Sequence, residues 1–403
     1  MSPRAWWPLA PLLALVAGGG LGACSDGADA AVGSAPDDAG ATADASADAE
    51  AGAADATDED AATYDPSARV TVPTMLSQLG LFTGGPGAGG QLAPTAGNVG
   101  YDLSTPLFSD YALKQRTVRV PPGAKAHYDA TAVLDFPVGT IFSKTFAFAA
   151  DLRAPTQAVR VVETRILVRQ PSGWEAWPYV WSADQADAKL APGGRVLPVS
   201  FVDASGGAVS FGYLVPSKNQ CEECHHVLDP QGQHVMVPIG PKARYLHHAR
   251  DYGGVVEDQL AHLASLGWLD GLPASAAIPR APDAFDPTDG TLEARARAYL
   301  DINCAHCHNP KGTAGVTSQL FLDAASATPL NLGVCKRPGS GGSDLGGKFD
   351  IVPGSHTQSI LWFRLSSTES GKMMPLLGRT LEHTAGAALV ADWIDAMPPQ
   401  ACE

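Results

Sequence analysis

Charged residues are scarce in this chain, and basic residues are scarcer than acidic ones. Only 17% of the 403 residues are charged, and 27 Lys and Arg stand against 42 Asp and Glu, which gives a formal net charge of -15. Proteins that bind nucleic acids through phosphate contacts need the opposite balance. We therefore expect no nucleic-acid partner.

The chain also lacks an unbroken apolar segment of the length that crosses a bilayer. The candidate is residues 5–20, which are interrupted by Pro8 and Pro11 and follow Arg4. A membrane-spanning helix needs about 20 consecutive apolar residues. A short apolar run after a positive charge is instead typical of a secretory signal peptide.

The four residues at the end of this run, 21–24 (LGAC), resemble the lipobox of bacterial lipoproteins. We expect residues 1–23 to be a lipoprotein signal peptide and Cys24 to be the lipidated residue. Ordinary cleavage near Ala23 is the alternative. The prediction places the protein at the cell envelope, on the periplasmic side or at the outer membrane, where only the lipid anchor enters the membrane.

Basic residues are absent from residues 25–65, which contain twelve Asp and Glu among Ala, Gly, Ser and Thr. Such a segment has little to bury and repels itself. We expect residues 24–65 to be an acidic, Ala/Asp-rich disordered tether. Most of the net charge lies in it, so the remainder of the chain is only mildly acidic.

Cysteine is also rare, with seven residues, yet four of them lie in two copies of one motif. The copies are residues 221–225 (CEECH) and 304–308 (CAHCH). With 7 Cys and 11 His, a random order of the residues would give about 0.003 C-x-x-C-H pentapeptides per chain. Two copies therefore do not arise by chance and indicate that the motif has a function.

The C-x-x-C-H spacing is typical of covalent haem attachment: two thiols bind the porphyrin edge, and the imidazole that follows reaches the iron. We expect two haem c groups. The attachment residues would be Cys221, Cys224, Cys304 and Cys307, with His225 and His308 as iron ligands.

A zinc or iron–sulfur site made of all four thiolates, or a redox-active C-x-x-C pair, is the chemical competitor. Haem is favoured because 80 residues separate the two pairs and a His follows each of them.

The other two cysteines, Cys335 and Cys402, remain after lipidation and haem attachment are accounted for. In an oxidising compartment we expect them to form a disulfide, with two buried thiols as the alternative.

The sequence specifies the second ligand of each haem iron less clearly than the first. For the second haem we predict Met374, because it precedes Pro375 and the expected last helix, and Met373 is the near alternative. For the first haem, Met236 and His262 compete. Met and His are both established haem ligands, so their chemistry does not choose between them.

Composition and periodicity predict a mixed fold in three parts. A β-rich, sandwich-like or partly open barrel domain is expected at 66–215, a first haem-binding segment at 216–285, and an all-α, cytochrome c-like domain at 286–403. Predicted strands and helices follow residue patterning. The strands are expected at 117–120, 132–143, 158–170, 174–181 and 208–215, and helices at 256–268, before Cys304, and at 384–397.

Several longer strings strengthen these expectations when taken together: 105–112 (TPLFSDYA), 163–165 (ETR), 219–221 (NQC), 238–242 (PIGPK), 295–301 (RARAYLD) and 373–375 (MMP). With the two motifs they resemble a family of bacterial exported diheme c-type cytochromes that have a β-rich region before the haem motifs. The resemblance implies electron transfer with redox partner proteins, including a parallel β-helix protein. It also implies haem attachment at the C-x-x-C-H residues.

The sequence thus favours a diheme electron carrier over an enzyme. The main alternative is a diheme redox enzyme of peroxidase type, in which one haem keeps an open coordination position. A further alternative makes the β-rich region a ligand-binding module with accessory haems, for which the aromatic residues at 174–181 offer a surface.

Overall fold

The computed structural model describes residues 64–325, 328–339, 345 and 347–403. Contacts divide the chain into two units, Met1–Ala61 and Ala62–Glu403, and the description below concerns the second. The expected signal peptide, the lipidation site Cys24 and nearly all of the expected tether lie outside the described residues.

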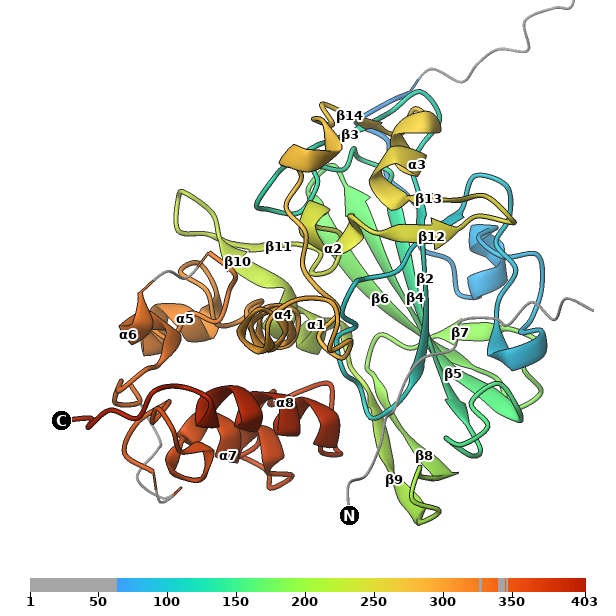
Figure 1. Cartoon of the computed structure of the whole chain (residues 1–403). Coiled ribbons are helices and arrows are strands. Elements are labelled where there is room, and N and C mark those ends of the chain that lie inside the picture. Colours follow the sequence, from blue (N-terminus) through green and yellow to red (C-terminus); the bar gives the residue numbers. More distant parts are fainter. Residues whose placement is uncertain (1–63, 326–327, 340–344, 346) are drawn as a thin grey trace, which may run out of the picture. The chain divides into compact units, whose positions relative to one another are not determined.

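A six-stranded antiparallel sheet with the order β1-β2-β4-β5-β6-β7 organises the described part of the chain (Figure 1). Its long central strands are rich in Val, Ile, Phe and Thr, which pack well on a pleated surface. The strands are β1 (Val99–Gly100), β2 (Leu113–Arg119), β4 (Ile141–Ala149), β5 (Val159–Gln170), β6 (Gly173–Trp181) and β7 (Ala188–Leu190).

Side chains alternate between the two faces of this sheet, and both faces carry hydrophobic clusters. On one face Ile141 and Ile166 pack with Leu76 and Leu81 from the segment that precedes the sheet. On the opposite face Phe142 belongs to one cluster, and Phe146 and Phe148 belong to another. The sheet is therefore the central layer of the protein.

Four smaller two-stranded sheets surround it. The β8–β9 hairpin packs on Phe146 and Phe148, and β14 extends β3 in parallel although more than 140 residues separate them. The pairs are β8 (Arg195–Val202) with β9 (Ala208–Val215), β10 (His226–Leu228) with β11 (His234–Met236), β12 (Ala249–Asp251) with β13 (Val256–Asp258), and β3 (Ala126–His127) with β14 (Leu269–Asp270).

The helices are short, and most of them follow the strands in sequence. Helix α8 packs on α4 and α7. The α-helices are α1 (Lys218–His225), α2 (Ala243–Leu246), α3 (Gln259–Ser265), α4 (Leu292–Cys304), α5 (Thr313–Ser318), α6 (Pro329–Leu332), α7 (Ile360–Ser366) and α8 (Thr384–Asp395), and the 3-10 helices are η1 (Leu76–Leu79), η2 (Ala88–Gly90), η3 (Ser275–Ala277) and η5 (His356–Gln358).

The expectation of an all-α, cytochrome c-like C-terminal domain is wrong. Residues 62–403 form one compact unit that is dominated by sheets, and helix α4 packs into the core on the sheet as well as into the helical core. Ala298 and Ile302 of α4 join Phe142 of the sheet, whereas Leu300 faces the helices. Helix α4 thus carries apolar side chains on two faces and contributes to two hydrophobic clusters.

The expected sandwich also differs from the structure, because the second layer on the sheet is only the two-stranded β8–β9 hairpin. The N-terminal half is tied to the C-terminal half by polar contacts as well. The Asp110 carboxylate accepts hydrogen bonds from the amides of Thr380 (2.6 Å) and Leu381 (2.7 Å), and the Phe108 amide donates to the Asn303 side chain at 2.8 Å.

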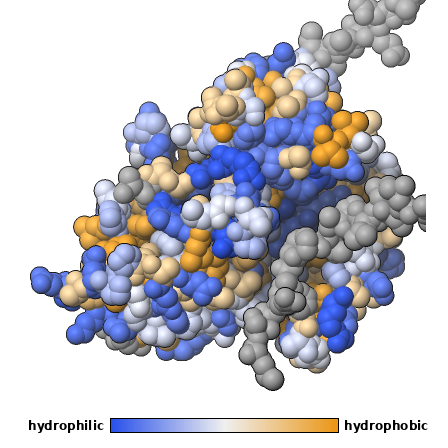
Figure 2. Space-filling view, in the orientation of Figure 1, coloured by the Kyte–Doolittle hydropathy of each residue, from blue (hydrophilic) through white to orange (hydrophobic). Residues whose placement is uncertain are grey.

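Surface hydrophobicity is dispersed on the face that Figure 2 shows, where hydrophobic patches alternate with hydrophilic ones. The most exposed large apolar side chains are Val256 (68%), Val196 (63%) and Leu330 (60%), which belong to three separate elements. Within the described ranges, the search for an apolar helix of bilayer-spanning length finds none.

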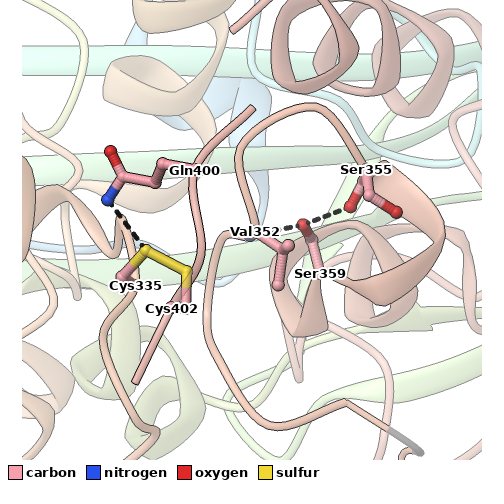
Figure 3. The surroundings of a disulfide bond; sticks show 6 residues. All are labelled: Cys335, Val352, Ser355, Ser359, Gln400 and Cys402. Atoms are coloured by element: carbon pink, nitrogen blue, oxygen red, sulfur yellow. Dashed lines mark hydrogen bonds between the residues drawn. A yellow bond between two sulfur atoms is a disulfide. The ribbon is translucent and has the colours of Figure 1, made fainter. Parts of the chain in front are cut away.

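A disulfide joins Cys335, just after α6, to Cys402 near the C-terminus, with an S–S distance of 2.00 Å (Figure 3). These two cysteines remain when the four motif cysteines and Cys24 are set aside. Gln400 Nε2 donates to the Cys335 sulfur at 3.0 Å. Nearby, the Ser359 hydroxyl donates to the Ser355 carbonyl at 2.9 Å and accepts from the Val352 amide at 2.8 Å, which fixes the loop before α7.

Candidate functional site

The first C-x-x-C-H motif lies on helix α1. The helix begins with a capping box, in which the Gln220 amide donates to the Ser217 hydroxyl (3.3 Å) and the Ser217 amide donates to the Gln220 side chain (3.0 Å). Residues three and four apart share one face of a helix. Cys221, Cys224 and His225 therefore lie on the same side of α1, as covalent attachment and iron ligation to one porphyrin require.

The second motif lies at the end of helix α4. Thr291 caps the start of α4, and Cys304 is its last residue. One more turn follows, in which the amides of Cys307 and His308 donate to the Cys304 carbonyl at 3.1 and 2.9 Å. The turn keeps Cys304, Cys307 and His308 on one side of the chain, like the first motif.

The two motifs meet in space. Ligand atoms of Cys224, His306 and Cys307 all lie within 4.8 Å of one another, and the Cys307 sulfur is 3.7 Å from the Glu223 carbonyl. The segments that follow the motifs are also joined, because the Leu228 amide donates to the Lys311 carbonyl at 2.8 Å. The sequence did not predict this convergence.

His225 is held in an orientation suited to iron binding. Its Nδ1 is 2.7 Å from the Val237 carbonyl, so Nδ1 carries the proton and Nε2 keeps its lone pair. Burial lowers the pKa of His225 to about 4, the bond to Val237 opposes this shift, and the charges of neighbouring groups add to it. The imidazole is therefore neutral at neutral pH, the state that a metal ligand needs.

His308 is similar. Burial lowers its pKa to about 4, and the Leu320 backbone, which follows it by twelve residues as Val237 follows His225, offsets part of the shift. Its Nδ1 is buried and has no hydrogen bond of normal geometry within the part of the chain that the structure describes.

Three of the four motif thiols favour neutral sulfur over thiolate. Burial raises the pKa of Cys221 to about 11 and that of Cys304 to about 12. The pKa of Cys224 is raised to about 12 by its hydrogen bond with Cys307 and by burial, and the same bond lowers the pKa of Cys307. A thioether is neutral and tolerates this burial.

A four-thiolate metal site is not formed. Of the four motif cysteines, only Cys224 and Cys307 belong to the cluster of potential metal ligands found among the described residues. Tetrahedral zinc or an iron–sulfur cluster needs all its ligands around one point.

Met374 lies in a loop beside the second motif. Its amide donates to the Arg364 carbonyl at 2.9 Å, and its carbonyl accepts two bonds from the buried guanidinium of Arg379 at 2.8 and 3.1 Å. The Arg379 charge is close enough to lower the pKa of Cys304, against the larger effect of burial. Met373, the alternative, donates its amide to the Glu369 carbonyl.

The candidates for the first distal ligand are placed differently. Met236 in β11 directly precedes Val237, whose carbonyl lies behind His225, so its backbone is on the side away from Nε2. His262 lies on α3, which Figure 1 shows well apart from α1. Its Nδ1 is 2.6 Å from Glu257, and its ring stacks on Tyr252.

The structure adds one partly buried imidazole that sequence patterns did not reveal. His383 stacks on Phe108 with ring centroids 4.1 Å apart, and its Nδ1 lies 3.1 Å from the Tyr299 hydroxyl. Burial lowers its pKa to about 3, and the charges of Lys114 and Arg379 act in the same direction. A single His before a helix belongs to no recognisable motif, so the sequence offers no reason to select it.

This imidazole should make stability depend on pH. An unfolded His has a pKa near 6.5, whereas folded His383 takes up its proton only near pH 3, so the unfolded state binds more protons between these values. Stability is therefore lost as pH falls through this window. We expect His383→Phe, which retains the stack, to reduce the slope of unfolding free energy against pH by about 1.4 kcal/mol per pH unit.

Urea unfolding of wild type and variant at several values between pH 4.5 and pH 6.5 measures the slope. The control is His234→Phe, an exposed position in β11. An unchanged slope in His383→Phe would contradict the prediction.

The chain matches no family model, no curated protein and no solved structure. What can be inferred about its function therefore comes from the two motifs and their surroundings.

Proposed function

We propose that this protein is an exported diheme c-type cytochrome that transfers electrons, as its resemblance to that family implies. The observation that carries the proposal is that each C-x-x-C-H motif places two thiols and a partly buried, neutral imidazole on one side of a helical turn. In the first motif, the bond from His225 to the Val237 carbonyl also directs the free Nε2 lone pair outward.

The residues of each motif have separate roles. Each thiol of Cys221, Cys224, Cys304 and Cys307 adds across a vinyl group, so that a sulfur–carbon bond forms and the thiol hydrogen passes to the neighbouring carbon; no oxidant is needed. His225 and His308 bind iron, and Met374 is the sixth ligand proposed at the second motif. Bound haem supplies one-electron oxidation and reduction.

The contact between the motifs supports electron exchange within the protein. Because Cys224 and Cys307 meet, the groups attached to them are neighbours. Electrons would then pass to redox partner proteins, among which the family resemblance indicates a parallel β-helix protein. The lipid anchor proposed at Cys24 would hold the protein at the envelope.

One observation favours a second candidate, a single metal ion held by Cys224, His306 and Cys307. This arrangement would leave Cys221, Cys304 and the imidazoles of His225 and His308 without a role. A structural zinc site also needs a fourth ligand.

Intact mass and the reduced absorption spectrum of the exported protein test the proposal. We expect the added mass of two haems, retained after denaturation, and a c-type spectrum. Protein without covalent haem that contains stoichiometric zinc would refute the proposal and support the shared metal site. A high-spin ferric component that binds cyanide or peroxide would replace the carrier by the peroxidase-type enzyme.

A further inference from the structure

Three cations form a row across the middle of the main sheet. In the strand register Arg116 of β2 pairs with Lys144 of β4, and Lys144 pairs with Arg165 of β5. Directly paired residues in an antiparallel sheet point to the same face. This is the face that carries Phe142 and Phe146, and we refer to Arg116, Lys144 and Arg165 as the cationic row.

The side chains of the cationic row have few hydrogen-bond and ion-pair partners. Arg116 is only 5% exposed, and one of its terminal nitrogens is buried without a hydrogen-bond partner. Lys144 has no carboxylate within ion-pair distance among the residues that the structure places. Only Arg165 has a strong partner, Glu163, whose oxygens lie 2.6 and 2.9 Å from it.

Few acidic groups lie near the cationic row. Lys114 adds a fourth cation one row away, and its ammonium donates only to the Ala112 carbonyl. The acidic groups that act on these cations are Glu163 and Asp110. Burial lowers the pKa of Lys114 to about 7 and that of Lys144 well below its usual value, so an anion beside them would favour their charged forms.

Aromatic contacts do not compensate this charge. Phe146 lies 4.9 Å from the Lys144 ammonium and 4.3 Å from the Arg165 guanidinium. Such contacts contribute about 0.5–2 kcal/mol, whereas burying an unpaired ion costs several kcal/mol. A bound anion would therefore add the partners that the row lacks, above all for the unpartnered Arg116 nitrogen.

The row lies near the first motif, because helix α1 packs against β6, the strand next to β5. The Arg165 charge is close enough to lower the pKa of Cys221, and the charges of Lys144 and Arg165 lower that of His225, in both cases as smaller contributions beside burial. Hydrophobic clusters lie on both sides of the row on the same sheet face, with Phe142 in one and Phe148 in the other. The position thus suits an apolar molecule that carries acidic groups.

We propose that Arg116, Lys144 and Arg165 bind the propionate carboxylates of the haem attached at Cys221 and Cys224, so that the sheet supplies the charged wall of this haem site. The inference rests on the proposed function. Carboxylate is the shared chemistry, and its other source would be a free carboxylate ligand bound to the row.

Reduction potentials test the proposal in the haem-loaded protein. We expect Lys144→Met and Arg116→Met each to lower the potential of one haem, because an adjacent positive charge favours the reduced iron, and to leave the other haem unchanged. Lys144→Arg should keep the wild-type value. The matched control is Lys189→Met, an exposed lysine in β7 of the same sheet.

The affected haem is identified by repeating the measurement in the Cys304→Ala/Cys307→Ala background, which keeps only the first attachment site. A shift in that background supports the proposal. Equal potentials in Lys144→Met, Arg116→Met and Lys189→Met would overturn it while leaving covalent haem, and hence the proposed function, intact. Absence of covalent haem from the wild type would instead refute both.

Malonate separates the two sources of carboxylate. If propionates fill the row, malonate should leave the melting temperature of the haem-loaded wild type unchanged. A rise in the wild type that is lost in Lys144→Met would show that the row binds a free carboxylate and would overturn the proposal.

A variant with all four motif cysteines replaced by Ala adds a readout without haem. In that full-length protein, Lys144→Met should raise the urea midpoint, because it removes a partly buried amine whose charged form burial disfavours. A lower midpoint would show that the ammonium is satisfied by the protein itself and would contradict the proposal.

Discussion

The Cys304→Ala/Cys307→Ala variant should be exported with one covalent haem, whereas the wild type should carry two. Each attachment needs the thiols of its own motif, and loss of both sulfurs leaves no atom that could form a thioether. Cys221→Ala/Cys224→Ala should have the same effect on the first haem. Intact mass after denaturation and the absorbance of reduced haem per chain measure both variants.

Cys335→Ala/Cys402→Ala is the matched control, because it also removes two cysteines, those of the disulfide, and should keep both haems. The variants also distinguish two haems from one metal bound between the motifs. A shared site at Cys224, His306 and Cys307 would lose its metal completely when either motif is changed. Complete loss in both variants would therefore contradict two independent attachment sites.

The sequence predicted that each motif brings its thiols and imidazole together, but it did not predict that the two motifs meet. Spacings of three and four residues place thiols and imidazole together on any helical turn, so local pattern is sufficient for that prediction. The contact between Cys224 and Cys307 depends on pairing between distant segments, such as the Leu228 amide with the Lys311 carbonyl. No local pattern records such a pairing.

Predictions of single elements succeeded where the pattern was long and regular. Strands expected at 158–170 and 174–181 match β5 and β6 closely, and the expected last helix matches α8. The strand expected at 132–143 was wrong over most of its length, because β4 begins only at Ile141, after Pro137 and a left-handed Gly139. β8 was missed, since its half-exposed residues include a proline.

The cationic row on the sheet was not recognised in the sequence either, because it also depends on pairing between distant segments. Only Arg165 lies within a strand that the sequence predicted, because Arg116 and Lys144 fall just outside the strands expected at 117–120 and 132–143. An alternating pattern also does not reveal what covers the polar face of a strand. Their common row exists only once the register of β2, β4 and β5 is known. The same limit hid the role of Glu163, which the sequence placed only in a family string.

Glu163→Gln should destabilise the protein by about 3–5 kcal/mol, the cost of breaking a buried ion pair by removing one partner. Glu163 is fully buried, accepts two bonds from Arg165 and accepts a third from the Tyr213 hydroxyl at 2.7 Å. Glutamine keeps the shape but removes the nearest negative charge to the cationic row. Urea unfolding of the haem-loaded protein measures the loss.

The control is Glu175→Gln on the neighbouring strand β6, whose ion pair with the exposed Arg69 should be worth about 0–1 kcal/mol. Glu163→Gln/Arg165→Met should recover much of the stability, because it removes the orphaned charge as well. Loss of a negative charge beside the first haem should also raise its potential, opposite to Lys144→Met. Shifts of the same sign would mean that these variants act by disturbing the fold and not through their charge.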